Sequence, residues 1–396
     1  MSRAHPGGPP HLVTLVLLTA MTVITTNMFL PALPAMQAAF DVSPAVIGLS
    51  ISLYMAVASA LQLILGPLSD RVGRRPVILG SLGVYVLASI ACLAAPTIEI
   101  LLAARAVQAV AVAGGVLASA MVRDLYDGPR AAAVLSTIAS SMAIAPMLAP
   151  MLGGVVATQF GWRAIFALYA VLGGGLLLWA FRDIGETLTP DTAAQREPFS
   201  RLLTERRFWA LAACQSLGVG AFYVFLTGAP FVAASQFGLD AAQIGFGLGS
   251  ITLGFLLGAG LSARIVSRVG SMRLVFAGRF VALAGLSLGL ILFAFADPPV
   301  WVLFAATIWV GVGNGLTLAN AHALALSVRP RLAGTAAGAI GALGNLSGAV
   351  LAGVATALLS QTASPERLFA IMLATVVLSL LAAIAARHWE RVHRHS

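Results

Sequence analysis

The chain has 396 residues, of which 59% are hydrophobic and only 9% are Asp, Glu, Lys or Arg, and its mean hydropathy is +0.96. Soluble globular proteins carry about 25% charged residues, so this composition excludes an ordinary soluble protein. At roughly 20 residues per membrane-spanning helix, the length accommodates about a dozen spans joined by short loops. The apolar runs are continuous, which argues against a β-barrel with its strands of alternating polarity.

The net charge of +9 comes from arginine alone, because none of the 23 basic residues is a lysine. Cytoplasmic loops of membrane proteins are rich in basic residues, so this charge does not by itself indicate a nucleic-acid partner. The two cysteines, Cys92 and Cys214, lie in apolar stretches without metal-ligand spacing. We therefore expect a protein of the lipid bilayer that uses no nucleic acid, no metal ion and no cofactor.

Apolar runs between clusters of charged and turn residues predict twelve spans. Their approximate limits are 12–33, 46–67, 76–95, 99–120, 132–157, 163–181, 208–230, 243–264, 273–295, 299–321, 334–359 and 367–386. The longest polar stretch separates the first six spans from the last six. The sequence thus predicts an all-α polytopic membrane protein with an N-terminal six-helix bundle (1–181), a cytoplasmic linker (182–207) and a C-terminal six-helix bundle (208–396).

Arginine placement predicts the orientation of these spans. With the N-terminus inside, 19 of the 23 arginines fall in the terminal segments and inner loops, and only Arg163 and Arg367 fall in outer loops. Both termini of this multi-pass protein are therefore expected in the cytoplasm. Arg105 and Arg279 fall inside spans. Arg279 is the nearer to the cytoplasmic end, where its long side chain is expected to reach the membrane surface.

A short internal repeat supports the division into halves. Arg71-Val72-Gly73 follows the second span, and Arg268-Val269-Gly270 follows the eighth, 197 residues later. Parallel six-helix halves are an architecture of secondary transporters.

The segment from Gly66 to Pro76 predicts a tight turn between two helices. Gly66 and Gly73 permit positive φ or close approach, and Pro76 suits the first turn of the next helix. Asp70 is a carboxylate placed at the inner membrane surface among three arginines, which favours a specific partner for it. The arginines are Arg71, Arg74 and Arg75.

This segment resembles the signature loop of the major facilitator superfamily, G-x-L-x-D-R-x-G-R-R. Further stretches are similar to the Bcr/CflA drug-resistance subfamily. They are Thr26-Asn27-Met28-Phe29-Leu30-Pro31-Ala32-Leu33-Pro34, Met121-Val122-Arg123-Asp124-Leu125-Tyr126, Pro146-Met147-Leu148-Ala149-Pro150-Met151-Leu152-Gly153-Gly154, Gly161-Trp162-Arg163-Ala164-Ile165-Phe166 and Ala333-Gly334-Thr335-Ala336-Ala337. The resemblance implies a twelve-helix, alternating-access carrier of a bacterial inner membrane that exports small molecules in exchange for protons, and we expect it to act as a monomer.

The same resemblance implies a conformational switch at the inner loop. Asp70 would receive N–H groups at the start of the span that begins near Gly334, and Arg74 and Asp124 would join this network. The switch residues are Gly66, Asp70, Arg71, Gly73, Arg74, Arg75, Arg123 and Asp124.

Polar and aromatic residues within spans are the candidates for substrate binding. Arg105 is a costly charge at membrane depth, and Gln108 lies one helical turn away on the same face. A guanidinium anchored only to helix carbonyls is the structural alternative. The candidate substrate-binding residues are Asn27, Arg105, Gln108, Met142, Phe222, Tyr223 and Asn314.

Proline and glycine share one face of the predicted fifth span. Met142, Pro146, Pro150 and Gly154 are spaced by four residues, and each proline frees a carbonyl four residues earlier. This pattern predicts a gating face between the halves, with Gly153 and Gly154 also allowing simple close packing.

Asn27 stands where the subfamily pattern usually has Asp. None of the 14 acidic residues is placed clearly at mid-membrane, whereas proton-coupled carriers generally use an intramembrane carboxylate or histidine. We therefore predict a secondary-active exporter of small drug-like molecules or metabolites, with an uncoupled or differently coupled facilitator, or an importer, as the alternative. An intramembrane enzyme is less favoured, because Ser347 and His322 have no supporting acid.

Overall fold

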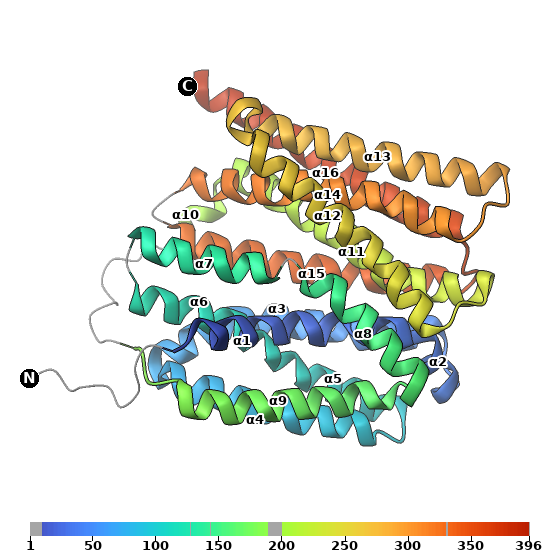
Figure 1. Ribbon diagram of the computed structural model, residues 1–396. Coiled ribbons are helices and arrows are strands. Elements are labelled where there is room, and N and C mark those ends of the chain that lie inside the picture. Colours follow the sequence, from blue (N-terminus) through green and yellow to red (C-terminus); the bar gives the residue numbers. More distant parts are fainter. Residues whose placement is uncertain (1–9, 127, 143, 189–199, 330–331, 396) are drawn as a thin grey trace, which may run out of the picture.

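The computed structural model describes residues 10–126, 128–142, 144–188, 200–329 and 332–395, and all regular structure in these ranges is helical (Figure 1). The first half contains α1 (Leu12–Asn27), η1 (Leu30–Ala32), α2 (Leu33–Phe40), α3 (Pro44–Val72), α4 (Arg74–Ala94), α5 (Ile98–Gln108), η2 (Ala109–Val112), α6 (Ala113–Leu125), α7 (Gly128–Met142), α8 (Ala145–Phe160) and α9 (Arg163–Asp183). The second half contains α10 (Ser200–Leu203), α11 (Arg206–Phe237), α12 (Ala241–Val269), α13 (Ser271–Phe295), α14 (Trp301–Val328), α15 (Ala333–Leu359) and α16 (Pro365–His395). The two halves form separate helical bundles that lie side by side.

Membrane-length helices account for nearly every predicted span, which confirms the fold class. Eleven helical segments of the described chain are long and apolar enough to cross a membrane. The remaining predicted span, 132–157, is divided between α7 and α8, and α8 has 16 residues. Pro146 lies in the first turn of α8, where a proline is tolerated because the N–H group that it lacks would have no partner within the helix. The first and fourth spans also contain short 3-10 segments, η1 and η2.

Helix boundaries repeat between the halves. Helices α3 and α12 both contain 29 residues, and each boundary of α12 lies 197 residues after that of α3. Each helix is followed by a glycine with positive φ, Gly73 at 109° and Gly270 at 88°. Side chains other than glycine rarely adopt these conformations. The weak sequence repeat thus reflects a structural repeat, as predicted.

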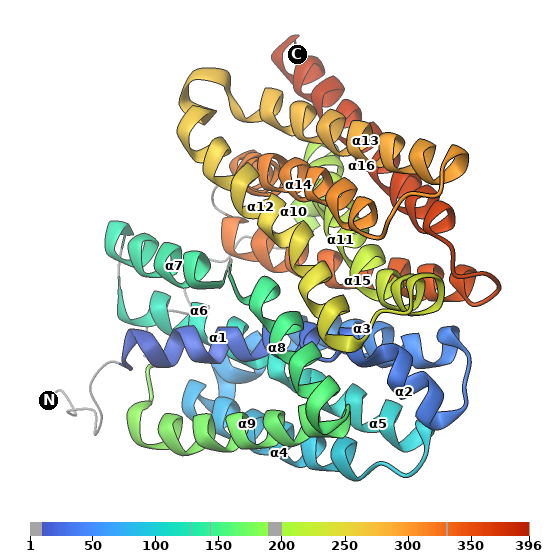
Figure 2. The same ribbon diagram turned by 45° about the vertical axis from the view of Figure 1, so that its right-hand side comes forward.

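The two bundles contact each other mainly through α3 with α15 and α8 with α12. In the first pair, the Ser59 hydroxyl donates to the Ala342 carbonyl at 2.8 Å, and the Asn345 amide donates to Gln62 Oε1 at 3.0 Å. Helices α8 and α12 meet at the end of the molecule opposite the chain termini (Figures 1 and 2). We call the end that carries both termini the terminal end.

Backbone approach between α8 and α12 depends on glycine. A Cβ atom on Gly154 would lie 2.3 Å from the Ala241 carbonyl oxygen, and one on Gly245 would lie 2.4 Å from the Pro150 carbonyl oxygen. Beside these contacts, the Ala242 N–H donates to the Thr158 hydroxyl at 3.0 Å. Any larger residue at either glycine would push the bundles apart at this end.

We predict that Gly154→Ala opens the contact between α8 and α12. Overpacking of this kind costs about 1–3 kcal/mol, which shifts a two-state equilibrium by about 5-fold to 150-fold. The measurement is the disulfide yield of a Thr158→Cys, Ala242→Cys pair in a background in which Cys92 and Cys214 are replaced by alanine. The yield should fall with Gly154→Ala.

The matched control is Gly174→Ala in α9, because a Cβ there meets no atom within 4 Å. Equal disulfide yields in the two glycine variants would contradict the role assigned to Gly154.

Candidate substrate site and terminal-end ion-pair network

Arg105 lies in the interior of the N-terminal bundle, and its side chain is 0% exposed. Its Nε donates to the Ser50 carbonyl of α3 at 3.2 Å, and its Nη1 donates to the Thr25 carbonyl of α1 at 3.4 Å. Nη1 also donates to Gln108 Oε1, so the predicted shared face of these two residues is confirmed. One guanidinium therefore ties α1, α3 and α5 together.

Aromatic rings cover the Arg105 guanidinium. Its Cζ atom lies 4.1 Å from the ring centroid of Phe29 and 4.6 Å from that of Tyr54, which are cation–π distances. No carboxylate of the described chain pairs with it, and Nη2 has no hydrogen-bond partner there. A buried donor without a partner is costly, and binding of a ligand acceptor by this enclosed group stays a prediction.

Asn27 and Tyr223 bring the two bundles into contact near this arginine. The Asn27 amide donates to the Val23 carbonyl at 2.7 Å, its Oδ1 is buried without a hydrogen-bond partner among the described residues, and its side chain lies near that of Tyr223 in α11. Phe222 packs edge-on against Tyr223, with ring centroids 5.6 Å apart. The structure thus places Asn27 near Tyr223 of the other bundle and encloses Arg105 with Phe29 and Tyr54. The substrate-contact role of Phe222 stays a prediction.

Arg279 corrects one expectation. Its side chain is 0% exposed in the C-terminal bundle and does not reach the membrane surface. Nη2 donates to Asn314 Oδ1 at 2.7 Å, and Nε donates to the Thr317 hydroxyl at 3.0 Å. Local polar partners on α14 hold this arginine inside the bundle, so it does not snorkel.

Asn314 is therefore placed away from the Arg105 group. Besides accepting from Arg279, it donates to the Gly218 carbonyl at 3.1 Å, so both ends of its amide are engaged within the C-terminal bundle. Met142 is the last residue of α7, and its side chain lies outside the part of the chain that the structure describes. The substrate-contact roles of Asn314 and Met142 stay predictions.

The predicted gating helix packs against both bundles. A Cβ on Gly153 would lie 1.7 Å from the Met28 carbonyl oxygen, so α8 also approaches the end of α1 very closely. Pro150 lies inside α8, and its carbonyl faces Gly245 of α12. The close packing expected of Gly153 and Gly154 is observed, and the gating role of this face stays a prediction.

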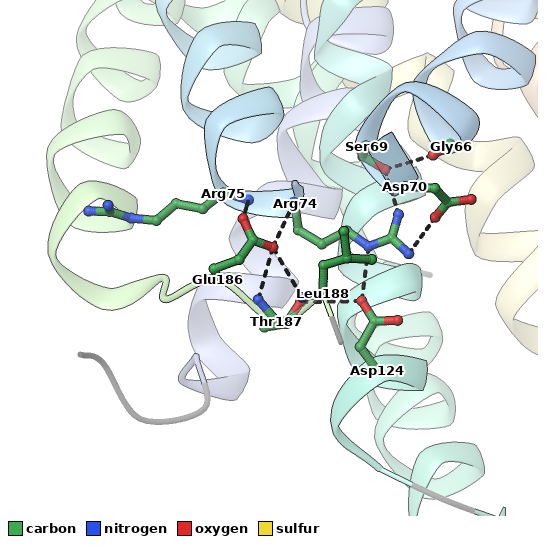
Figure 3. Close-up of polar contacts among 9 residues, drawn as sticks. All are labelled: Gly66, Ser69, Asp70, Arg74, Arg75, Asp124, Glu186, Thr187 and Leu188. Carbon is green, nitrogen blue, oxygen red and sulfur yellow. Dashed lines mark hydrogen bonds and ion pairs between the residues drawn. The ribbon is translucent and has the colours of Figure 1, made fainter. Parts of the chain in front are cut away.

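Figure 3 shows the terminal-end network around Arg74. Arg74 Nη2 lies 2.7 Å from Asp70 Oδ1, and Nε donates to Asp124 Oδ2 at 2.9 Å. The Arg74 side chain also donates to the Ser69 hydroxyl and is only 6% exposed. The association of Asp70, Arg74 and Asp124 is therefore confirmed.

The predicted turn at Gly66 is wrong. Helix α3 continues through Gly66 and Pro67 to Val72, and the chain turns only at Gly73. Pro67 does not end the helix. Arg71 and Arg123 are exposed at the same end of the molecule. Contact of Asp70 with the start of α15 stays a prediction.

Glu186 completes this network, and sequence reasoning missed it. Its Oε1 accepts backbone N–H groups of Arg74, Thr187 and Leu188 at 2.8, 3.1 and 3.1 Å, and its Oε2 accepts that of Arg75 at 3.2 Å. A carboxylate at the N-terminus of a helix satisfies orphan donors and interacts favourably with the helix dipole. Glu186 thus caps α4 from a segment that follows α9.

Thr187 adds a second link, since its hydroxyl donates to Asp124 Oδ2 at 3.3 Å. A Cβ atom on Gly73 would lie only 2.5 Å from Glu186 Oε2, so a larger residue would collide with the carboxylate. Gly73 is therefore required both by its positive φ and by the space that Glu186 occupies.

The family model of the Major Facilitator Superfamily matches residues 15–352 of this chain. The chain belongs to the Major Facilitator Superfamily. It is a membrane transporter and not an enzyme. The network around Arg74 lies on the signature loop from which the resemblance was drawn.

Curated relatives support the drug-resistance branch of this family. The chain is 32% identical to a chloramphenicol resistance protein of Pseudomonas aeruginosa, over 93% of this chain and 89% of the relative. It is 30% identical to multidrug resistance protein D of Escherichia coli, over 89% of each chain. A bicyclomycin resistance protein homologue of Haemophilus influenzae is 28% identical over 94% of each.

Solved structures share the fold at low sequence identity. A bacterial homologue of the human lysosomal transporter Spinster, in an inward-facing and occupied conformation, matches with a TM-score of 0.76 at 17% identity over 96% of each chain. A human organic anion transporter matches with a TM-score of 0.69 at 18% identity, over 95% of this chain and 98% of that one.

We predict that Glu186→Gln lowers the thermal stability of the protein. Loss of the carboxylate charge weakens the cap on α4 and should cost about 1 kcal/mol. Thermal unfolding in detergent, followed by the loss of the monodisperse peak in size-exclusion chromatography, measures the change. Glu99→Gln is the matched control, because Glu99 lies in the first turn of α5 but is exposed. An equal fall in the unfolding temperature of both variants would contradict a specific stabilising role for the Glu186 cap on α4.

Proposed function

We propose that this protein is a secondary-active, alternating-access exporter of small drug-like molecules in a bacterial inner membrane. The observation that carries the proposal is the likeness of nearly the whole chain to a chloramphenicol resistance protein. Chloramphenicol is therefore the first compound to test. The protein acts as a monomer, with its terminal end in the cytoplasm, because that end carries the exposed arginines of the inner loops.

Movement between the bundles is the proposed means of transport. The contacts of α8 with α12 close the end opposite the termini, and their dependence on Gly154 and Gly245 suits an interface that separates and re-forms. Asn27 at the end of α1 lies near Tyr223 of α11, so a compound bound between them would contact both bundles, and Phe222 beside Tyr223 is a further proposed contact. At the terminal end, Asp70 would act as the latch by contacting the start of α15 when that end closes, while Arg74 and Asp124 of its own bundle hold it in position.

Two sources of energy for transport are compatible with the sequence: a proton gradient, or another ion gradient or none. Family resemblance favours proton antiport, but every described acidic residue lies at or near the end of a helix. Position 27 carries an amide, which does not titrate in the physiological range. His322 is bound to Gln215, with Nδ1 and Oε1 3.2 Å apart. A differently coupled or uncoupled carrier is therefore the second candidate function, and Asn27 is the residue that favours it.

We predict that a proton gradient drives little uphill movement of chloramphenicol in proteoliposomes containing the wild-type protein. Unless another ion drives it, transport should be downhill and only weakly dependent on pH, because no carboxylate of the described residues lies in the middle of a membrane-spanning helix. Asn27→Asp should increase the pH dependence, since a partly buried carboxyl can have its pKa raised towards neutrality. Uphill transport that an uncoupler abolishes would contradict the reading of Asn27 and leave the exporter proposal intact.

We predict that Arg105→Lys weakens chloramphenicol binding by about tenfold while the protein still inserts and folds. Lysine keeps the charge but loses the planar fork that reaches several acceptors. Ligand-induced thermal stabilisation measures the affinity, and the unliganded melting temperature measures the structural effect.

Arg279→Lys is the matched control, because Arg279 is equally buried but serves the interior of the other bundle. It should lower the melting temperature and leave the affinity unchanged. If Arg105→Lys behaves in the same way, Arg105 is a structural anchor and not a binding residue.

A further inference from the structure

A basic hollow lies between α13 and α16 at the terminal end, remote from the candidate substrate site. Its volume is about 240 Å³. It is lined by Met272, Arg273, Phe276, Arg387, Glu390 and Arg391. Both helices lie at the outer edge of the C-terminal bundle (Figures 1 and 2), so the hollow faces the surroundings of the protein and not the other bundle.

Three arginines give this hollow an excess of positive charge. Arg273, Arg387 and Arg391 are exposed, and none of them forms an ion pair within the described part of the chain. The one acidic lining residue, Glu390, is held by Arg207 of α11 at 3.3 Å. Arg387 lies over the ring of Phe276 at 5.5 Å. The hollow is therefore prepared for an anion.

The surface next to the hollow is apolar on its membrane side. Phe280 is 58% exposed and lies one turn beyond Phe276 on the same face of α13. On α16, Ile384 is 49% exposed and lies one turn before Arg387, and Leu381 is 54% exposed and lies one turn before Ile384. Guanidinium groups thus lie at the end of an exposed apolar strip that continues into the depth of the membrane.

We propose that this hollow binds the phosphodiester headgroup of an anionic phospholipid, whose acyl chains lie along Phe280, Leu381 and Ile384. Basic pockets between transmembrane helices at the membrane surface are suited to such headgroups, and arginine is suited to bidentate contact with phosphate oxygens. Inorganic phosphate offers the same oxygens, but it would leave the apolar strip unused. A bound lipid would join α13 to α16 at the terminal end.

Native mass spectrometry of the purified, full-length protein tests this proposal. Dioleoylphosphatidylglycerol and dioleoylphosphatidylcholine are titrated separately. The fraction of protein that binds lipid is compared between the wild type and a double variant that carries Arg273→Gln and Arg391→Gln. We expect tighter binding of the anionic lipid, reduced roughly fivefold for each arginine replaced. A variant with Arg273→Lys and Arg391→Lys should regain most of the affinity, because it keeps the charge.

Two arms distinguish the site from general attraction. Arg264→Gln, Arg268→Gln is the matched control, since both arginines are exposed near the terminal end of α12 and do not line the hollow; it should bind the anionic lipid as the wild type does. Inorganic phosphate at the same concentration should not displace the lipid. Equal binding of the two lipids, unchanged binding by the Arg273, Arg391 variant, an equal loss in the control, or displacement by phosphate would each overturn the proposal.

Discussion

A guanidinium buried inside a membrane protein has to find its partners within the protein, because the bilayer core provides none. Among the described residues, each bundle contains one arginine that is 0% exposed. Arg105 joins α1, α3 and α5 through the carbonyls of Thr25 and Ser50 and through Gln108. Arg279 joins α13 to α14 through Thr317 and Asn314. The packing of helices within each bundle depends on satisfying these two charges, so each bundle is expected to move as a unit.

The interface between the bundles is built differently. Small residues and backbone carbonyls dominate the contacts of α8 with α12, and single hydrogen bonds such as that from Ser59 to Ala342 connect α3 with α15. Such contacts need little side-chain rearrangement to separate. Stable bundles with a separable interface are what an alternating-access carrier requires, and the ion pairs around Arg74 lie at the end where a latch would act.

Hydropathy and repeats made the fold predictable. Spans of about 20 apolar residues can be recognised locally, and the Arg-Val-Gly repeat marks equivalent turns after α3 and α12 because only glycine fits there. Asp70, Arg74 and Asp124 were predicted together because they lie in recognisable motifs. The break between α7 and α8 was not predicted, because a span that contains prolines can either bend as one helix or divide into two.

Contacts between segments that are far apart in the chain could not be predicted from the sequence. Glu186 caps α4 across 112 residues, and no local pattern reveals which helix end a linker carboxylate will reach. Arg279 was wrongly expected at the surface, because its partners Asn314 and Thr317 come from another helix. The turn was expected to begin at Gly66 because glycine permits positive φ, but α3 continues past Gly66 and Pro67 to Val72.

Two pairs of spin labels test the movement of the bundles most directly. One pair, at Val72 of α3 and Ser327 of α14, reports on the terminal end, and the other, at Phe160 of α8 and Gln236 of α11, reports on the opposite end. All four positions are exposed. Pulsed electron–electron distance measurements, with and without a transported compound, should show one distance shortening as the other lengthens. Distances that stay fixed, or that change in the same direction, would contradict alternating access.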